Sequence, residues 1–306
     1  EAQAGRGPDA LALLTSNRDR LLSQPADHVD ALALYGSLLA GAGRTDDARA
    51  LLAPPELSVD GRAQIFLAIA RGLFPRPEQA RAWLNDPANP MNMDDPAHVQ
   101  ALGQVWFDLA GVRGGSLDDY RKVIEIAARI ASDPERRLAA AGLLAAAYDQ
   151  TGRYDEAEVA YRLVLESNPE QPVILNNLAF LMLKRDKAAV SDEPIRLAES
   201  AVSLAKAQGL SPTIQASMMD TLGAAQYRSG KFINAAQTFK TALDVLPDDP
   251  ELVAGLAESL VAQADPANAD EIRTLISRFD RLARTRVVTP TARERMEPVR
   301  AWAQKN

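Results

Sequence analysis

Residue types that could carry chemistry are few and scattered in this sequence. The two histidines, His28 and His98, are far apart, and the chain has no cysteine. Metal ligands and general bases usually come from histidine, cysteine and carboxylate residues at short, regular spacing. Neither histidine stands in such a pattern. We therefore expect both to be helix-surface residues, and we expect no catalytic residue, no metal site and no cofactor.

Two glycine-containing segments invite comparison with phosphate-binding loops. GVRGGS at 111–116 could wrap an anion with backbone amides, but it follows no strand and lacks the lysine of a P-loop. SGKF at 229–232 resembles the end of a P-loop, yet the earlier glycine is missing. We interpret the first as an insertion and the second as a turn between helices.

Carboxylates offer no better case for catalysis. Asp155, Glu156 and Glu158 typify acids at helix starts, where they are usually solvated. No acid pair stands out as a general acid–base couple. The sequence therefore predicts a chain that is not an enzyme.

Composition favours an elongated helical protein. The 306 residues are 47% apolar and 5% aromatic, with a net charge of −7. Alanine and leucine dominate, which favours close-packed helices over sheet, and a solenoid can grow beyond the size of one core. The negative charge argues against a general nucleic-acid binder, and no apolar run reaches the length of a membrane span. The lack of cysteine leaves both an oxidising and a reducing compartment open.

The clearest pattern runs from Arg137 to Gln171. Large and small apolar residues recur at helical spacing on either side of a glycine, and a proline closes the unit. The residues of this pattern are Leu144, Ala145, Tyr148, Gly152, Ala157, Tyr161, Val164 and Pro169.

A similar ten-residue pattern occurs four times along the chain. A glycine that permits a tight turn opens each copy, and an alanine marks where two helices approach closely. The copies are GRGPDALALL at 5–14, GRTDDARALL at 43–52, GRYDEAEVAY at 152–161 and GKFINAAQTF at 230–239. The first copy begins at Gly5, so we expect the chain to start inside a repeat.

These phrases resemble the tetratricopeptide repeat, a 34-residue helix–turn–helix. The resemblance implies an all-α, right-handed superhelical solenoid of about six or seven antiparallel helix pairs. We expect degenerate repeats at 1–136, well-matched repeats at 137–264 with an insertion near 186–194, and capping helices at 265–306. The phrases NNLAF and DTLGA look like those of large bacterial repeat proteins.

Two segments interrupt the regular pattern. NDPANPMNMDDP at 85–96 has too much proline, asparagine and aspartate for a helix, so it is the expected hinge. From Arg273 to Asn306 there are nine Arg or Lys against three Asp or Glu. We favour an exposed cap with its arginines on the polar face and with Leu282, Val299 and Trp302 buried. A docking surface for an acidic partner is the alternative.

In the resembled family, the first helix of each unit lines a concave groove that holds a peptide or partner helix. An asparagine there can pair with a peptide backbone through its donor and its acceptor. A helix-capping role for Asn176 is the alternative. The chaperone-tail clamp of some members is not expected, because only Asn177 matches it. The groove positions carried over are Asn176, Asn177, Phe180, Leu183 and Lys184 in one unit, and Asp220, Ala224, Tyr227 and Arg228 in the next.

The sequence thus predicts a non-enzymatic scaffold that binds a protein or peptide partner. A regulatory or substrate-delivery domain of a larger upstream enzyme and a self-assembly module are the alternatives, and a homo-oligomer stays possible. No nucleic acid or membrane insertion is expected. The compartment stays open between bacterial cytoplasm and periplasm or envelope.

Overall fold

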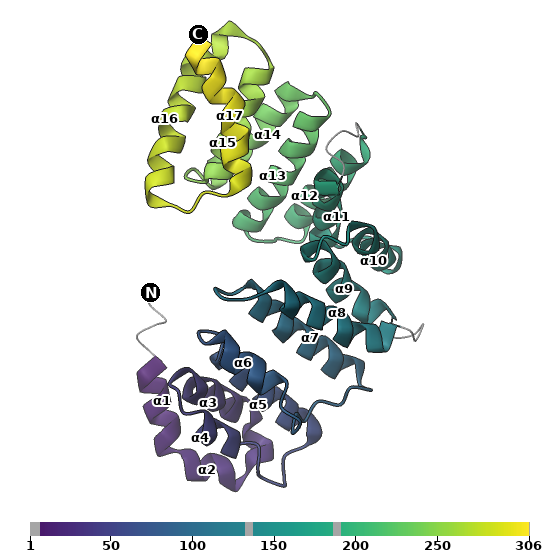
Figure 1. Ribbon diagram of the computed structural model, residues 1–306, viewed down its shortest axis with the longest axis vertical. Coiled ribbons are helices and arrows are strands. Elements are labelled where there is room, and N and C mark those ends of the chain that lie inside the picture. Colours follow the sequence, from purple (N-terminus) through teal and green to yellow (C-terminus); the bar gives the residue numbers. More distant parts are fainter. Residues whose placement is uncertain (1–6, 132–136, 186–190, 306) are drawn as a thin grey trace. The chain divides into compact units, whose positions relative to one another are not determined.

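A computed structural model describes residues 7–131, 137–185 and 191–305 (Figure 1). All regular structure within these ranges is helical, and no strand occurs there. The all-α prediction is therefore confirmed. The chain divides into two compact units, unit 1 (Glu1–Ala160) and unit 2 (Tyr161–Asn306). This division falls inside helix α10 (Tyr154–Ser167). The limits predicted at 137 and 265 stay predictions.

Unit 1 contains the helices before α10. They are α1 (Gly7–Ser16), α2 (Arg18–Ser23), the 3-10 helix η2 (Pro25–His28), α3 (Val29–Gly41), α4 (Thr45–Ala50), α5 (Val59–Gly72), α6 (Pro77–Leu84), α7 (Pro96–Gly111), α8 (Leu117–Ala131) and α9 (Arg137–Gln150).

Unit 2 contains the helices after α10. They are α11 (Pro172–Arg185), α12 (Glu193–Ala207), α13 (Pro212–Arg228), α14 (Phe232–Val245), α15 (Pro250–Ala262), the 3-10 helix η3 (Pro266–Asn268), α16 (Ala269–Thr285) and α17 (Pro290–Lys305). Consecutive helices from α3/α4 to α15/α16 form the pairs of a helical solenoid. The predicted insertion near 186–194 lies mostly outside the described residues, as does Gly5.

Three of the four turn glycines adopt the predicted left-handed conformation. Their φ angles are 83° at Gly43, 76° at Gly152 and 73° at Gly230. After each glycine the next amide bonds back to the helix, as Arg153 N–H does to the Tyr148 carbonyl at 2.9 Å. This pattern satisfies carbonyls that the helix end would leave unpaired. The local phrase therefore fixes how one helix turns into the next.

Ion pairs about one repeat apart join successive pairs of helices. Arg49 lies 2.6 Å from Asp86, and Lys240 lies 2.9 Å from Glu271. Arg76 also donates to the Ala40 carbonyl at the end of α3. A cation there interacts favourably with the partial negative charge of the helix C-terminus. Neighbouring repeats are thus linked by polar contacts at their edges as well as by apolar packing.

The segment predicted as a hinge is held by several hydrogen bonds. Asp86 accepts from Ala88 N–H at 2.8 Å, and Asn89 accepts from Met91 N–H at 2.9 Å. Asn92 N–H donates to the imidazole of His98 on α7 at 2.9 Å. The loop therefore folds into local turns against α7, and its role as a hinge stays a prediction.

The core of unit 2 is organised around Phe239 on α14. Phe239 is 1% exposed, and its ring touches one glycine of α13 and one of α15. A Cβ placed on Gly223 of α13 would lie 2.7 Å from its Cζ, and one on Gly255 of α15 would lie 2.5 Å away. Only residues without a side chain let both helices approach this ring. The three helices are thereby set in one register.

Helix α17 closes unit 2. The Thr289 hydroxyl accepts from Ala292 N–H at 3.2 Å, and Pro290 is the first helical residue, so Thr289 caps the start of α17. Leu282 and Val299 are buried, whereas Trp302 is only partly so. Several arginines of this end form ion pairs, as Arg300 does with Asp280 at 2.5 Å. The cap therefore covers the core cluster of unit 2.

Candidate partner-binding surface on α11 and α13

Three of the predicted groove residues form one stripe along α11. Asn176, Phe180 and Lys184 follow one another at intervals of four residues, so they share a face of the helix. Phe180 is 45% exposed, which is unusual for a phenylalanine. The Lys184 ammonium lies 5.6 Å from the centre of the Phe180 ring, within range of a cation–π interaction. The stripe thus presents an apolar surface next to a positive charge.

Asn176 does not cap a helix, because it lies inside α11. Its Oδ1 atom is shielded from solvent and accepts no hydrogen bond from the described residues. A shielded amide oxygen without a donor is unfavourable by about 1–3 kcal/mol. Rotation of this side chain toward a bound backbone N–H would remove that penalty. Asn177, the neighbouring candidate, is half-buried.

The end of α13 lies beside the end of α11, as the repeat pattern predicted. The Arg228 guanidinium donates to the carbonyl of Leu183 near the C-terminus of α11. Arg228 therefore supports the helix end as well as adding charge to the surface. Leu183 itself was expected in the groove, and this is wrong. It packs in the core with residues of α11, α12 and α13, at the buried edge of the face that carries the stripe.

Tyr227 is not an open aromatic anchor. It is half-buried, and its ring centre lies 5.3 Å from that of Phe232. Burial, together with the charge of Glu258 and a hydrogen bond to it, raises the pKa of Tyr227 to about 12. The phenol therefore stays protonated and donates to Glu258. It contributes a hydrogen bond inside unit 2 rather than a free contact.

Asp220 is engaged with a residue that the sequence did not single out. Its Oδ1 lies 2.8 Å from Nη1 of Arg295 on α17. Arg295 was counted among exposed arginines, but its side chain is only 14% exposed. The sequence could have indicated this burial, because Arg295 lies at helical spacing from the apolar residues Ala292, Met296 and Val299. Asp220 and Tyr227 of α13 are thus engaged inside unit 2, whereas Phe180 of α11 and Arg228 of α13 are exposed.

The expectation that His98 lies on a helix surface is wrong. His98 is buried, since the loop before α7 folds over it. Its Nδ1 accepts from Asn92 N–H, so the ring proton belongs on Nε2, 3.1 Å from Asp60 Oδ1. Asp95 completes a cluster whose ligand atoms lie within 4.8 Å of one another.

This cluster is better suited to hydrogen bonding than to metal binding. A metal on Nε2 would require His98 to lose its only ring proton, because Nδ1 is already an acceptor. In metal sites the second ring nitrogen normally donates a proton instead. Asp95 is also committed, as its Oδ1 caps α7 by accepting from Ala97 N–H at 2.8 Å. His28 lies elsewhere, half-buried at the end of η2.

The GVRGGS loop uses its polar groups internally. Ser116 N–H donates to Asp119 Oδ2 at 2.9 Å, and Arg81 donates to the Gly114 carbonyl at 2.9 Å. Arg81 also forms two hydrogen bonds with Asp119, at 2.8 and 2.7 Å. The Gly115 and Ser116 amides are therefore already engaged by the Val112 carbonyl and the Asp119 carboxylate, which agrees with the interpretation of this loop as an insertion.

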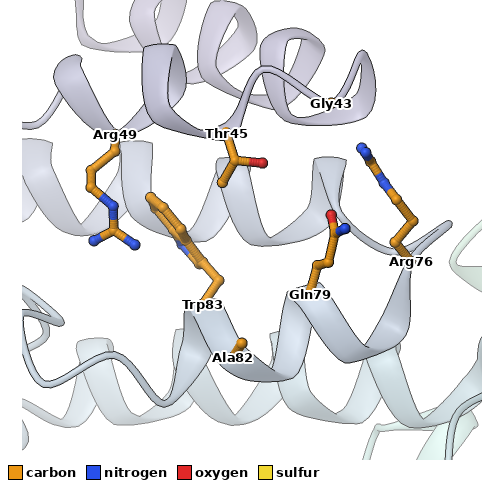
Figure 2. A pocket seen from close by; sticks show the side chains of 7 residues that line it. All are labelled: Gly43, Thr45, Arg49, Arg76, Gln79, Ala82 and Trp83. Atoms are coloured by element: carbon orange, nitrogen blue, oxygen red, sulfur yellow. The ribbon is translucent and has the colours of Figure 1, made fainter.

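A cavity of about 340 Å³ lies between α4 and α6 (Figure 2). Arg49, Arg76 and Trp83 dominate its walls. The Arg49 guanidinium stacks 4.5 Å from the Trp83 ring centre and pairs with Asp86, while Arg76 is bound to α3 carbonyls. Both cations in this cavity thus have structural partners within unit 1.

Comparison with known proteins places the repeats in a family. Residues 138–171 match the family model of the tetratricopeptide repeat. These residues span α9 and α10, the segment with the clearest pattern. No curated protein sequence matches the chain.

Solved structures share the fold at low identity. The APC/C hetero-tetramer Cut9–Hcn1 has a TM-score of 0.57 at 13% identity, covering 96% of this chain and 52% of that one. Yeast Tom70 has a TM-score of 0.55 at 16% identity, covering 99% and 59%. The human IFIT1 dimer with PPP-AAAA has 0.51 at 14%, covering 98% and 68%. At these identities the likeness concerns the fold alone.

The match at 138–171 and the paired helices around it define a helical-repeat architecture in the described residues. More particularly, the chain folds as an all-α solenoid in which α9 and α10 form the repeat that the family model matches. Across the described ranges, no helix is long and apolar enough to cross a membrane. A bacterial origin and the compartment stay predictions.

Proposed function

We propose that this protein is a non-enzymatic scaffold that binds a segment of a partner protein along α11. The observation that carries the proposal is Asn176, whose shielded Oδ1 lacks a hydrogen-bond donor beside the exposed ring of Phe180. A bound segment would supply a backbone N–H to the asparagine and an apolar side chain to the ring. Arg228 and Lys184 would orient its negative end.

The contacts of the described residues support a narrower set of candidates for direct contact. Asn176, Asn177, Phe180, Lys184 and Arg228 remain candidates for direct contact. Asp220 and Tyr227 are committed to contacts inside unit 2, so they would act only if those contacts open. The partner footprint is therefore proposed on α11 and the end of α13.

The test starts from peptides selected by display on the full chain, because the partner is unidentified. Affinity of the selected peptides is then measured for Phe180→Ala and Asn176→Ala chains. Removing an interface anchor should weaken binding by about 1–4 kcal/mol, roughly 5- to 1000-fold. Ile233→Ala is the matched control, since Ile233 is 74% exposed on α14.

Folding provides the second control. Phe180→Ala should leave the melting temperature nearly unchanged, whereas Gly223→Leu should lower it sharply, because any side chain there collides with Phe239. If Ile233→Ala weakens the peptides as much as Phe180→Ala does, the surface on α11 is the wrong one. Self-association lost in Phe180→Ala would instead favour the self-assembly alternative.

A further inference from the structure

Helix α17 does not extend the stack in the way that the earlier helices do. In unit 2, α13 packs closely on α12, and α15 packs closely on α14. The first helix of each pair therefore packs on the second helix of the preceding pair. By contrast, α17 packs mainly against α15 and only slightly against α16. It also reaches α13 through Arg295. α17 thus lies along α15, and the side chain of Arg295 reaches from it to α13.

The contacts of Arg295 define what this surface recognises. Its Nη1 lies 2.8 Å from Asp220 Oδ1 on α13 and 3.3 Å from the Glu251 carbonyl on α15. Its guanidinium lies 5.5 Å from the centre of the Phe239 ring. Glu258 also interacts electrostatically with it. An acidic and aromatic site on α13, α14 and α15 therefore receives one arginine.

The apolar part of the contact is small. Three side chains of α17, Ala292, Met296 and Val299, are buried in the core cluster. Most other residues of the helix are polar. Pro298 lies inside the helix and removes one of its backbone hydrogen bonds, since proline has no N–H to donate. Buried ion pairs also gain little over their desolvation. These features describe a helix that is held less firmly than α13 or α15.

We infer that the inner face of α13 and α15 is a binding surface for an amphipathic helix with one central arginine, and that α17 is its resident occupant. A partner helix that carries an arginine, with small or medium apolar residues three positions before it and one and four after it, competes with α17. The surface is separate from the α11 stripe. The inference goes beyond the proposed function and does not rest on it.

The test uses the full chain and a labelled peptide of residues 287–305. Arg295→Glu in the chain places a carboxylate beside Asp220 and Glu258, which should release α17. The peptide, which keeps its arginine, should then bind at least tenfold more tightly than it binds the unaltered chain. Arg300→Glu is the matched control. It is the same substitution on the same helix, but Arg300 pairs with Asp280 of α16.

A charge exchange tests the recognition itself. Asp220→Arg in the chain should favour a peptide with Arg295→Glu over the unaltered peptide. If folded Arg295→Glu chain binds no peptide, or if Arg300→Glu has the same effect, the inference is overturned.

If the Arg295→Glu chain does not fold, hydrogen exchange on the unaltered chain still tests whether α17 can be displaced. Amides of α17 should exchange by an opening that leaves α15 protected. Simultaneous exchange of α17 and α15 would mean that α17 is a fixed part of the core, and would refute displacement.

Discussion

At the scale of single residues, the buried carboxyl of Glu258 in unit 2 should make stability depend on pH. Glu258 lies between Tyr227, Arg228 and Arg295. Burial raises its pKa, even though the positive charge of Arg295, the hydrogen bond with Tyr227 and the charge of Arg228 all act to lower it. The ionised carboxylate is therefore disfavoured in the folded chain relative to the unfolded one.

This pKa shift predicts how stability changes with pH. Below the unfolded pKa, near 4.5, both states hold the proton and no penalty exists. As the pH rises toward the raised folded pKa, the unfolded state loses its proton first, so the free energy of unfolding falls and then levels off. Glu258→Gln should remove this fall. Urea unfolding from pH 4 to pH 8 would show it, and parallel curves for the two chains would contradict the prediction.

Residues of the candidate site show where sequence patterns stop being informative. The spacing of Asn176, Phe180 and Lys184 along one helix was predictable, because helical period alone sets it. The burial of His98 and the pairing of Asp220 with Arg295 were not. Both depend on segments that meet only after folding, and no local spacing encodes such a meeting.

At the scale of elements, one buried ion pair joins α6 to α8. Asp119 has a side chain only 3% exposed, and Arg81 binds it through two nitrogens. Burial alone would raise the pKa of Asp119, but the hydrogen bonds from Arg81 and from the Ser116 amide, with the Arg81 charge, hold it below the usual value. The pair therefore favours the ionised carboxylate and fixes how α6 lies against the start of α8.

Arg81→Met should destabilise unit 1 by about 3–5 kcal/mol, because it leaves a buried carboxylate without its partner. Arg121→Met is the control, since Arg121 and Asp118 form a largely exposed pair and should contribute less than about 1 kcal/mol. Denaturant titration measures both changes. Equal effects of the two substitutions would show that the Arg81 pair has no special role.

Helix pairs and their turns were predictable because the information is local. The glycines at 43, 152 and 230 fix the turn, and the apolar period fixes the buried face. The path of α17 across α15 was not predictable, since its three buried residues fit a stacked position equally well. Arg295, which composition made look exposed, is the residue that connects α17 to both α13 and α15.

At the scale of the whole molecule, each unit has its own core. Unit 2 contains a large continuous cluster around Phe239, while the early helices of unit 1 are shorter and pack chiefly on their neighbours. In solenoids, stability is roughly a sum of nearest-neighbour terms. We therefore predict that unfolding departs from a single two-state step.

Tryptophan positions make this prediction measurable. Trp83 and Trp106 lie in unit 1, and Trp302 lies in unit 2. In a Trp302→Phe chain, fluorescence reports unit 1 alone, whereas circular dichroism reports helices of both units. The two urea curves should have different midpoints. Coincident curves, with equal calorimetric and van't Hoff enthalpies, would argue for one cooperative unit.

The enclosure of α15 has a consequence for synthesis in the cell. Val253, Leu256 and Leu260 are almost wholly buried, and α16 and α17 supply part of their cover. Both helices are translated after α15. At about 5–20 residues per second, residues 263–305 take roughly 2–9 s to make. Until α16 and α17 are made, this apolar surface of α15 lacks part of its cover. How often newly made chains aggregate should therefore depend on how fast the codons for residues 263–305 are translated, a dependence that refolding of the finished protein would not show.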